Sequence, residues 1–311
     1  MTEALLATLP LPWPFDREYM QLALGAAVVV GVCAPLIGVF LVQKKMALMG
    51  DGVGHLAFAG VAAGLLLEVA PLWSALVVAI IGALAIDWLQ RRGRATGDLA
   101  LALVFYGGIA LGVVLVSRSG AGSLSVVEYL FGSILTVTPQ DLGLIAGLGI
   151  AIVTMLALFG RPLFAAVLDE DAARVAGLPV DATSALLSVL TAVTVVAAMR
   201  VVGVLLVAAL MVLPVASSRL LARSFRGTLV IAVLVGVLSA VVGLAGARAW
   251  GSAPGGTIVL AATACFGIVA VGTTTVGDAG RRRRTPPDML IDVQNPGALP
   301  PHGQQTGRTE G

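Results

Sequence analysis

An aspartate and a histidine lie four residues apart in the segment GDGVGHLAFAG, residues 50–60. On a helix, side chains at this spacing project from one face about one turn apart, so Asp51 and His55 can share a ligand. A carboxylate oxygen and an imidazole nitrogen are suitable donors for a divalent transition ion such as zinc or manganese. Two donors are too few to enclose an ion. A symmetric dimer would supply four and still allow the ion to dissociate.

The ordinary alternative is that Asp51 and His55 only form a hydrogen bond that stabilises their helix. Their segment, Met46 to Leu67, is otherwise mostly apolar. Placing an ionisable side chain at mid-bilayer costs at least a few kcal/mol of free energy unless the group is paired or hydrated. Because of this cost, the pair is interpreted as functional. Other candidates are given no role: Glu68 and Asp87 are expected to be solvated at span ends, Arg200 to reach the outer interface, Met46 and Met49 to pack, and His302 to be inert.

The composition indicates that the elements carrying this pair lie in a membrane. Of the 311 residues, 58% are hydrophobic and 12% are charged, against roughly a quarter charged in a soluble domain. The net charge of +2 provides no broad basic surface, which excludes nucleic acid as a partner. Cys33 and Cys265 each lie in an apolar run. Neither a disulfide framework nor a Cys/His zinc module is therefore expected.

A helix that spans the bilayer needs about 20 mostly apolar residues. Eight charge-free stretches meet this need: Leu22–Val42, Val69–Ile86, Leu99–Ser117, Leu142–Gly160, Ala182–Met199, Val201–Ser218, Gly227–Ala247 and Ala249–Gly277. The segment Met46–Leu67, which contains Asp51 and His55, either crosses as a ninth span or dips in and returns. The predicted fold class is all-α, a polytopic transmembrane helical bundle of eight to nine spans.

If Met46–Leu67 crosses, the basic clusters all fall on one side, which the positive-inside bias assigns to the cytoplasm. These clusters are Lys44 and Lys45; Arg91, Arg92 and Arg94; Arg161 and Arg174; Arg219, Arg223 and Arg226; and Arg281 to Arg284. The C-terminus is then expected in the cytoplasm, and residues 1–21 carry no cleavable signal. Residues 1–277 are predicted to form the membrane domain, and the Pro-, Gly- and Gln-rich residues 278–311 a disordered cytoplasmic tail.

Two connections are predicted to hold short helices. Ser125–Thr138 is apolar but short, which favours a helix lying at the outer interface. Leu163–Pro179 places three acids, Asp169 to Asp171, before an Ala-rich stretch that ends in Gly-Leu-Pro. This pattern favours a short cytosolic helix with a stop signal.

Five segments together resemble the permease subunit of bacterial ABC importers for zinc and manganese, the ABC-3 metal-permease family. They are LMGDGVGHLAFAGVAAGLLL from Leu48, EYLFGSILTVTPQDL from Glu128, LDEDAARVAGL from Leu168, MRVVGVLLVAALMVLPVASSRLL from Met199, and APGGTIVL from Ala253. The resemblance runs from about Phe15 to Val276. It implies a multi-pass permease of the ABC-importer type in the bacterial plasma (inner) membrane.

The resemblance also implies partners and site residues. Family permeases are homodimeric or paired, each half docks on a cytosolic ABC ATPase subunit, and an extracytoplasmic metal-binding receptor protein delivers the ion. The family's GDxxxH segment falls on Asp51 and His55, which implies that they coordinate the transported ion. Its acidic segment implies an ATPase-coupling helix that includes Asp169, Glu170, Asp171, Ala173 and Gly177. The sequence departs from the family pattern at two places. Gly54, the residue before the histidine, stands where Ser or Ala is usual, which leaves the fine ion preference open. The acidic run lacks the proline that family members commonly have between its acids.

The predicted function is ATP-driven import of a divalent transition metal ion. Zinc is favoured because EYLFGSILTVTPQDL resembles zinc-type permeases most, and manganese or iron follows. No P-loop occurs, so the chain is expected not to be an enzyme, and ATP hydrolysis is expected from a separate subunit. No permanently bound cofactor is expected, since Zn²⁺ or Mn²⁺ is the cargo. The signatures of an intramembrane hydrolase are missing, and an ATPase-independent secondary carrier and a scaffold protein are the alternatives.

Overall fold

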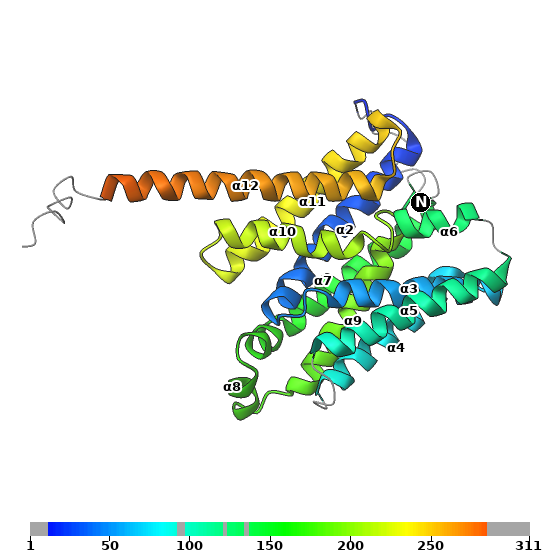
Figure 1. Cartoon of the computed structure of the whole chain (residues 1–311), viewed down its shortest axis with the longest axis horizontal. Coiled ribbons are helices and arrows are strands. Elements are labelled where there is room, and N and C mark those ends of the chain that lie inside the picture. The colour runs from blue at the N-terminus through cyan, green and yellow to red at the C-terminus, as the bar shows by residue number, and fades with distance from the viewer. Residues whose placement is uncertain (1–11, 92–96, 121–122, 134–136, 285–311) are drawn as a thin grey trace, which may run out of the picture. The chain divides into compact units, whose positions relative to one another are not determined.

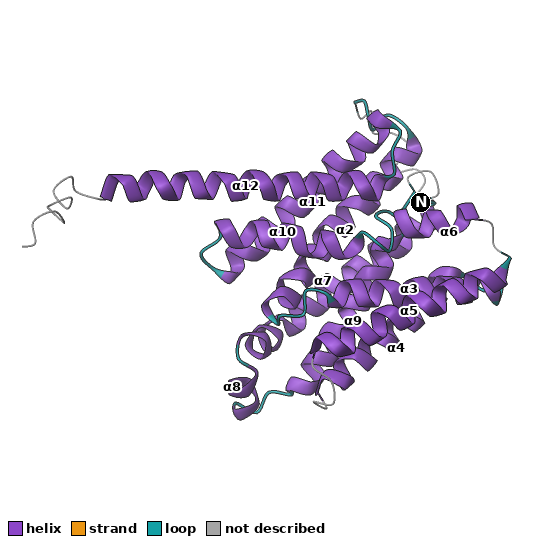
Figure 2. Cartoon of the chain, in the orientation of Figure 1, coloured by secondary structure: helices purple, strands orange, loops and turns teal. Residues whose placement is uncertain are grey.

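The computed structural model describes residues 12–91, 97–120, 123–133 and 137–284, and the regular structure in these ranges is helical (Figures 1 and 2). The helices are α2 (Glu18–Gln43), α3 (Met49–Leu66), α4 (Pro71–Arg91), α5 (Gly97–Ser119), α6 (Ser123–Phe131), α7 (Pro139–Leu168), α8 (Glu170–Val175), α9 (Val180–Met199), α10 (Val207–Leu221), α11 (Phe225–Trp250) and α12 (Pro254–Arg284). The all-α prediction is confirmed.

Among the described residues, eight helices are long and apolar enough to cross a membrane: α2, α3, α4, α5, α7, α9, α11 and α12. The segment that carries the Asp/His pair is one of them. Helix α3 is an unbroken helix of 18 residues. At about 1.5 Å per residue its length is about 27 Å, close to the thickness of the hydrocarbon layer. This length favours a crossing helix over a segment that dips in and returns.

The prediction of one span over Val201–Ser218 is wrong. Residues 201–206 form turns, and α10 begins only at Val207 and has 15 residues. The amides of Val204 and Leu205 donate to the carbonyls of Tyr129 and Leu130 at the end of α6, not to a preceding helical turn. Non-helical backbone is tolerated at membrane depth where protein surrounds and satisfies it. Apolar composition alone therefore could not distinguish this buried connection from a spanning helix.

Two glycines make this connection possible. Gly203 has a φ of +87°, and a Cβ there would lie 2.4 Å from the carbonyl oxygen of Leu130. A Cβ on Gly255, in the first turn of α12, would lie 1.8 Å from the carbonyl oxygen of Val202. Three backbone segments therefore meet with no room for side chains between them.

We expect Gly203→Ala to destabilise the protein by about 2–5 kcal/mol, because the left-handed conformation costs about 1–2 kcal/mol and overpacking about 1–3 kcal/mol. Gly120→Ala is the matched control, since Gly120 also has a positive φ of +62° but faces open space. Thermal unfolding in detergent should give a clearly lower midpoint for Gly203→Ala. Equal midpoints for the two variants would show that the backbone contact is unimportant.

The helices that position the Asp/His pair lie in or next to the most buried part of the bundle. Helices α2, α3 and α9 are the most buried of the spanning helices, and α3 packs against α4, α5 and α9. Figure 1 shows α3, α4 and α5 running side by side. Helix α5 covers one side of α3, and only 11% of its own spanning part is buried by the described residues.

The two predicted short helices are present. Helix α6 begins at Ser123, two residues before the predicted segment, and ends at Phe131. Helix α8 lies within the predicted segment Leu163–Pro179, although α7 continues as far as Leu168. At the C-terminal end, α12 runs to Arg284. Residues 285–311 of the predicted tail lie outside the described residues, and the division of the chain at residue 277 stays a prediction.

Candidate metal centre

Helix α3 places the Asp/His pair in the packed part of the bundle. Small residues on α3 and α5 let their neighbours approach closely: a Cβ on Gly54 would lie 3.2 Å from the carbonyl oxygen of Val204, and one on Gly108 would lie 3.1 Å from the carbonyl carbon of His55. Because the backbones are this close, α5 and the connection at Val204 fix the position and rotation of α3. The pair is therefore held on a rigid element.

Asp51 and His55 point toward one another, as their spacing predicts. The Nε2 atom of His55 lies 3.8 Å from the Oδ1 atom of Asp51. Two donors that are each about 2.0–2.2 Å from one ion lie within about 4.4 Å of each other, so this separation fits a shared ion. At 3.8 Å the two atoms are too far apart for an ordinary hydrogen bond, which argues against the purely structural interpretation.

No third His, Cys, Asp or Glu joins the pair among the residues that the structure describes. Within the part of the chain that the structure describes, no group of three or more His, Cys, Asp or Glu side chains could hold a metal ion. A stable zinc site has four ligands as a rule, and a transport site must release its ion. Two donors per chain therefore suit either weak, transient binding or a site completed by another molecule.

A cavity of about 300 Å³ adjoins the pair. Its walls come from the start of α3 and from α5: Leu48, Asp51, Gly52, Leu101, Ala102, Phe105 and Tyr106. The Asp51 side chain is 33% exposed, whereas the His55 side chain is 9% exposed and packs edge to face against the Phe105 ring. The carboxylate is therefore the donor that this cavity reaches.

Helix α8 contains the residues predicted to couple to an ATPase. Asp169 caps its N-terminus by accepting a hydrogen bond from the amide of Ala172, and Glu170 pairs with Arg174. Ala173 is buried against α7 and α9, which attaches the helix to the bundle. Asp171 is exposed, and Gly177 has a φ of +78°, the left-handed conformation in which glycine ends a helix. The helix thus presents its acidic side outward.

The expectation that Asp87 is solvated is wrong. Asp87 is 3% exposed near the end of α4, where it pairs with Arg91 of the same helix and accepts a hydrogen bond of 2.6 Å from the Ser184 hydroxyl of α9. Ser184 in turn accepts a hydrogen bond from Lys44, which follows α2. Spacing along α4 predicts the Arg91 partner, but Ser184 is 97 residues away in the sequence. Glu68, in contrast, is exposed as expected.

This polar cluster extends to α8. Arg91 also lies 3.4 Å from Asp181, and Asp181 lies 3.5 Å from Arg174. Burial lowers the pKa of the Lys44 ammonium below its usual range, and the attraction of Glu170 acts in the opposite direction. Ion pairs and hydrogen bonds therefore connect α8 to the ends of α4 and α9 and to the turn that leads into α3.

Arg200, which follows α9, forms an ion pair with α7 and was expected only to reach the outer interface. Its guanidinium donates to Asp141 at 3.0 Å and lies over the Tyr129 ring. Asp141 also closes a capping box with Thr138 at the start of α7. This cluster ties α6, α7 and the end of α9 together at the opposite end of the bundle from α8.

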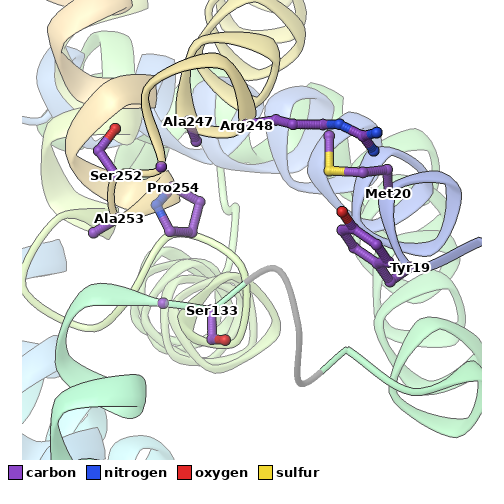
Figure 3. A pocket seen from close by; sticks show the side chains of 10 residues that line it. Tyr19, Met20, Ser133, Ala247, Arg248, Ser252, Ala253 and Pro254 are labelled. Atoms are coloured by element: carbon purple, nitrogen blue, oxygen red, sulfur yellow. The ribbon is translucent and has the colours of Figure 1, made fainter. Parts of the chain in front are cut away.

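A second cavity, of about 380 Å³, lies near the start of α2 and the turn between α11 and α12 (Figure 3). Its walls are Tyr19, Met20, Gly132, Ser133, Ala247, Arg248 and residues 251–254. Arg248 is the charged residue of this wall, and it forms an ion pair of 2.6 Å with Asp16. A wall with an arginine and no carboxylate does not suit a divalent cation. The candidate metal centre is therefore at α3.

Comparisons with known proteins agree with this architecture. The model of the ABC 3 transport family matches residues 16–272. The chain is 33% identical to the manganese transport system membrane protein MntC of Halalkalibacterium halodurans, over 81% of this chain and 86% of that protein. It is 31% identical to the high-affinity zinc uptake system membrane protein ZnuB of Haemophilus influenzae, over 80% and 95% respectively.

A solved structure supports the fold. The chain superposes on PsaBC from Streptococcus pneumoniae, solved in complex with Fab, with a TM-score of 0.75 and 31% identity, covering 82% of this chain and 91% of that one. The family match covers most of the chain and includes α3, α8 and the connection at residues 201–206. The chain therefore belongs to the ABC 3 transport family.

Proposed function

We propose that this permease imports a divalent transition metal ion, Zn²⁺ or Mn²⁺, into the cytoplasm, and that Asp51 and His55 hold the ion on its way. The observation that carries the proposal is a carboxylate and an imidazole 3.8 Å apart on a membrane helix, with the carboxylate lining a cavity. The metals named for MntC and ZnuB support this class of cargo. The chain is a transporter permease, and ATP hydrolysis belongs to a separate subunit of the importer.

A second copy of the permease would complete the site. One chain provides two donors, and the side of α5 that faces away from α3 has no neighbour among the described residues. A two-fold axis that brought the two Asp51/His55 pairs together would assemble two carboxylates and two imidazoles, which is a four-donor set acceptable to zinc and manganese. An extracytoplasmic receptor protein would supply the ion to this dimer.

Helix α8 would transmit the action of the ATPase. Its acidic side is exposed for contact with a partner, and its other side is attached to the bundle through Ala173 and the Arg174–Asp181 pair. Displacement of α8 when the ATPase binds ATP would shift α4 and α9, which pack against or near α3. Such a shift could exchange outward for inward access to the ion, as alternating access requires.

Zinc is our choice between the two metals, because the segment EYLFGSILTVTPQDL from Glu128 resembles zinc-type permeases most. In cells that lack the gene for the chain, uptake of radioactive zinc should fall, and restoring the gene should recover it. An excess of unlabelled zinc of about tenfold should suppress the uptake of radioactive zinc more than the same excess of manganese does. Stronger suppression by manganese would assign the importer to that ion.

The competing function is a carrier that works without an ATPase. Purification of the tagged permease from its own host distinguishes the two. We expect an ABC ATPase subunit to co-purify and uptake to stop when cellular ATP is depleted while the proton gradient is kept. Uptake that continues under these conditions would support the carrier.

A further inference from the structure

The two proposed donors differ in their access to the cavity beside them. Asp51 lines the cavity of about 300 Å³, whereas His55 does not contribute to its walls. The exposed fractions agree, since the Asp51 side chain is 33% exposed and the His55 side chain 9%. An ion in this cavity can therefore touch the carboxylate without touching the imidazole.

Phe105 of α5 contacts both the cavity and His55, which is absent from the cavity wall. Phe105 lines the cavity, and its ring centroid also lies 4.2 Å from that of His55, at an interplanar angle of 72°. Phe105 therefore contacts both His55 and the cavity. The close approach of Gly108 to the His55 backbone, one turn further along α5, keeps this part of α5 against α3. The arrangement is thus built into the helix pair.

We propose that the Phe105 ring acts as a shutter that controls access of the ion to His55. This inference rests on the proposed function, because it assigns different access to the two donors of the proposed site. Direct coordination needs a metal–nitrogen distance of about 2.0–2.1 Å, and in this proposal the ring turns aside before an ion in the cavity comes that close to the imidazole.

The shutter gives the site two affinities. With the ring closed, the ion is held by Asp51 alone, which is a weak site suited to rapid entry and exit. With the ring open, Asp51 and His55 hold the ion together, since their atoms already lie at a compatible separation of 3.8 Å. Phe105 is therefore a positioning residue, which determines when His55 takes part and does not itself bind the metal.

The direct test is the accessibility of a cysteine at each donor position. In a full-length permease whose Cys33 and Cys265 are replaced by serine or alanine, Asp51→Cys and His55→Cys are labelled with a small water-soluble methanethiosulfonate reagent. Because labelling needs access to the thiol, we expect His55→Cys to react at least about tenfold more slowly than Asp51→Cys. Adding Phe105→Ala should bring the two rates within a few-fold of each other.

Phe58→Ala is the matched control, because Phe58 also fills the space between α3 and α5, where a Cβ on Gly112 would lie 2.5 Å from its ring. This control should leave His55→Cys slow to react. Equal labelling at the two positions with Phe105 present, or no acceleration on its removal, overturns the shutter. If Phe105→Ala fails to yield folded protein by gel filtration, Phe105→Leu, which lacks the ring, takes its place.

The labelling requires no metal or partner, so its outcome is independent of the proposed transport function. If the labelling pattern is as expected but the proposed transport function proves wrong, His55 is shielded by Phe105 without being a metal ligand. That outcome overturns the role of Phe105 in metal binding. A kinetic measurement tests that role in the working importer. Phe105→Leu should lower both the KM and the maximum rate of metal uptake, because His55 then holds the ion at all times. An unchanged KM overturns the control of His55 by Phe105.

Discussion

Replacing either Asp51 or His55 with alanine should reduce metal uptake on the order of 100-fold or more, because even loss of a residue that only supports a metal ligand costs about 10–100-fold. Each substitution removes one of the two donors that a chain contributes, and in a symmetric dimer it removes two of four. The remaining donor could not bind the ion strongly enough to take it from a receptor. Uptake by intact cells, with zinc and with manganese, provides the measurement.

The same cells should contain normal amounts of each variant in the membrane, since the two side chains lie 3.8 Å apart and make no ordinary hydrogen bond to each other that would be lost. Glu68→Ala is the control, because Glu68 is an exposed acid at the end of the same helical segment. It should transport normally. Unchanged uptake in Asp51→Ala or His55→Ala would remove that residue from the proposed site.

The second large effect is expected at a residue far from the ion. Asp87→Ala should destabilise the permease by about 3–5 kcal/mol, the range observed when one partner of a buried ion pair is removed. Asp87 is 3% exposed, and its loss leaves Arg91 with a single partner, Asp181, and the Ser184 hydroxyl without its acceptor. We expect a lower midpoint of thermal unfolding in detergent and reduced amounts in the membrane.

A second variant at Asp87 shows whether the charge or the bulk of the side chain is responsible, and a variant at Asp171 is the control. Asp87→Asn retains the size of the side chain and an acceptor for Ser184 but not the charge, and it should recover only part of the stability. Asp171→Ala removes an exposed acid of α8 and should leave the unfolding midpoint unchanged. If Asp87→Ala and Asp171→Ala unfold at the same temperature, the polar cluster makes no contribution to folding.

The sequence by itself was sufficient for the features that depend on local pattern. Apolar stretches predict helices because a lipid environment forces the backbone to satisfy its own hydrogen bonds, so composition and length identify most spans. The juxtaposition of Asp51 and His55 follows from a spacing of four on a helix. Helix α8 follows from acids placed before an Ala-rich run with a glycine stop, and the structure has Asp169 as its cap.

Tertiary structure decided what depends on contacts between distant segments. Residues 201–206 are as apolar as a span, yet hydrogen bonds to Tyr129 and Leu130 hold them as a connection. Asp87 is buried and not solvated because Ser184, 97 residues away, packs beside it. The position of Phe105 over His55 depends on the packing of α5 on α3. Local pattern determines which groups an element presents, whereas the packing of elements determines which of those groups meet, because side-chain partners on separate helices have no fixed spacing in the sequence.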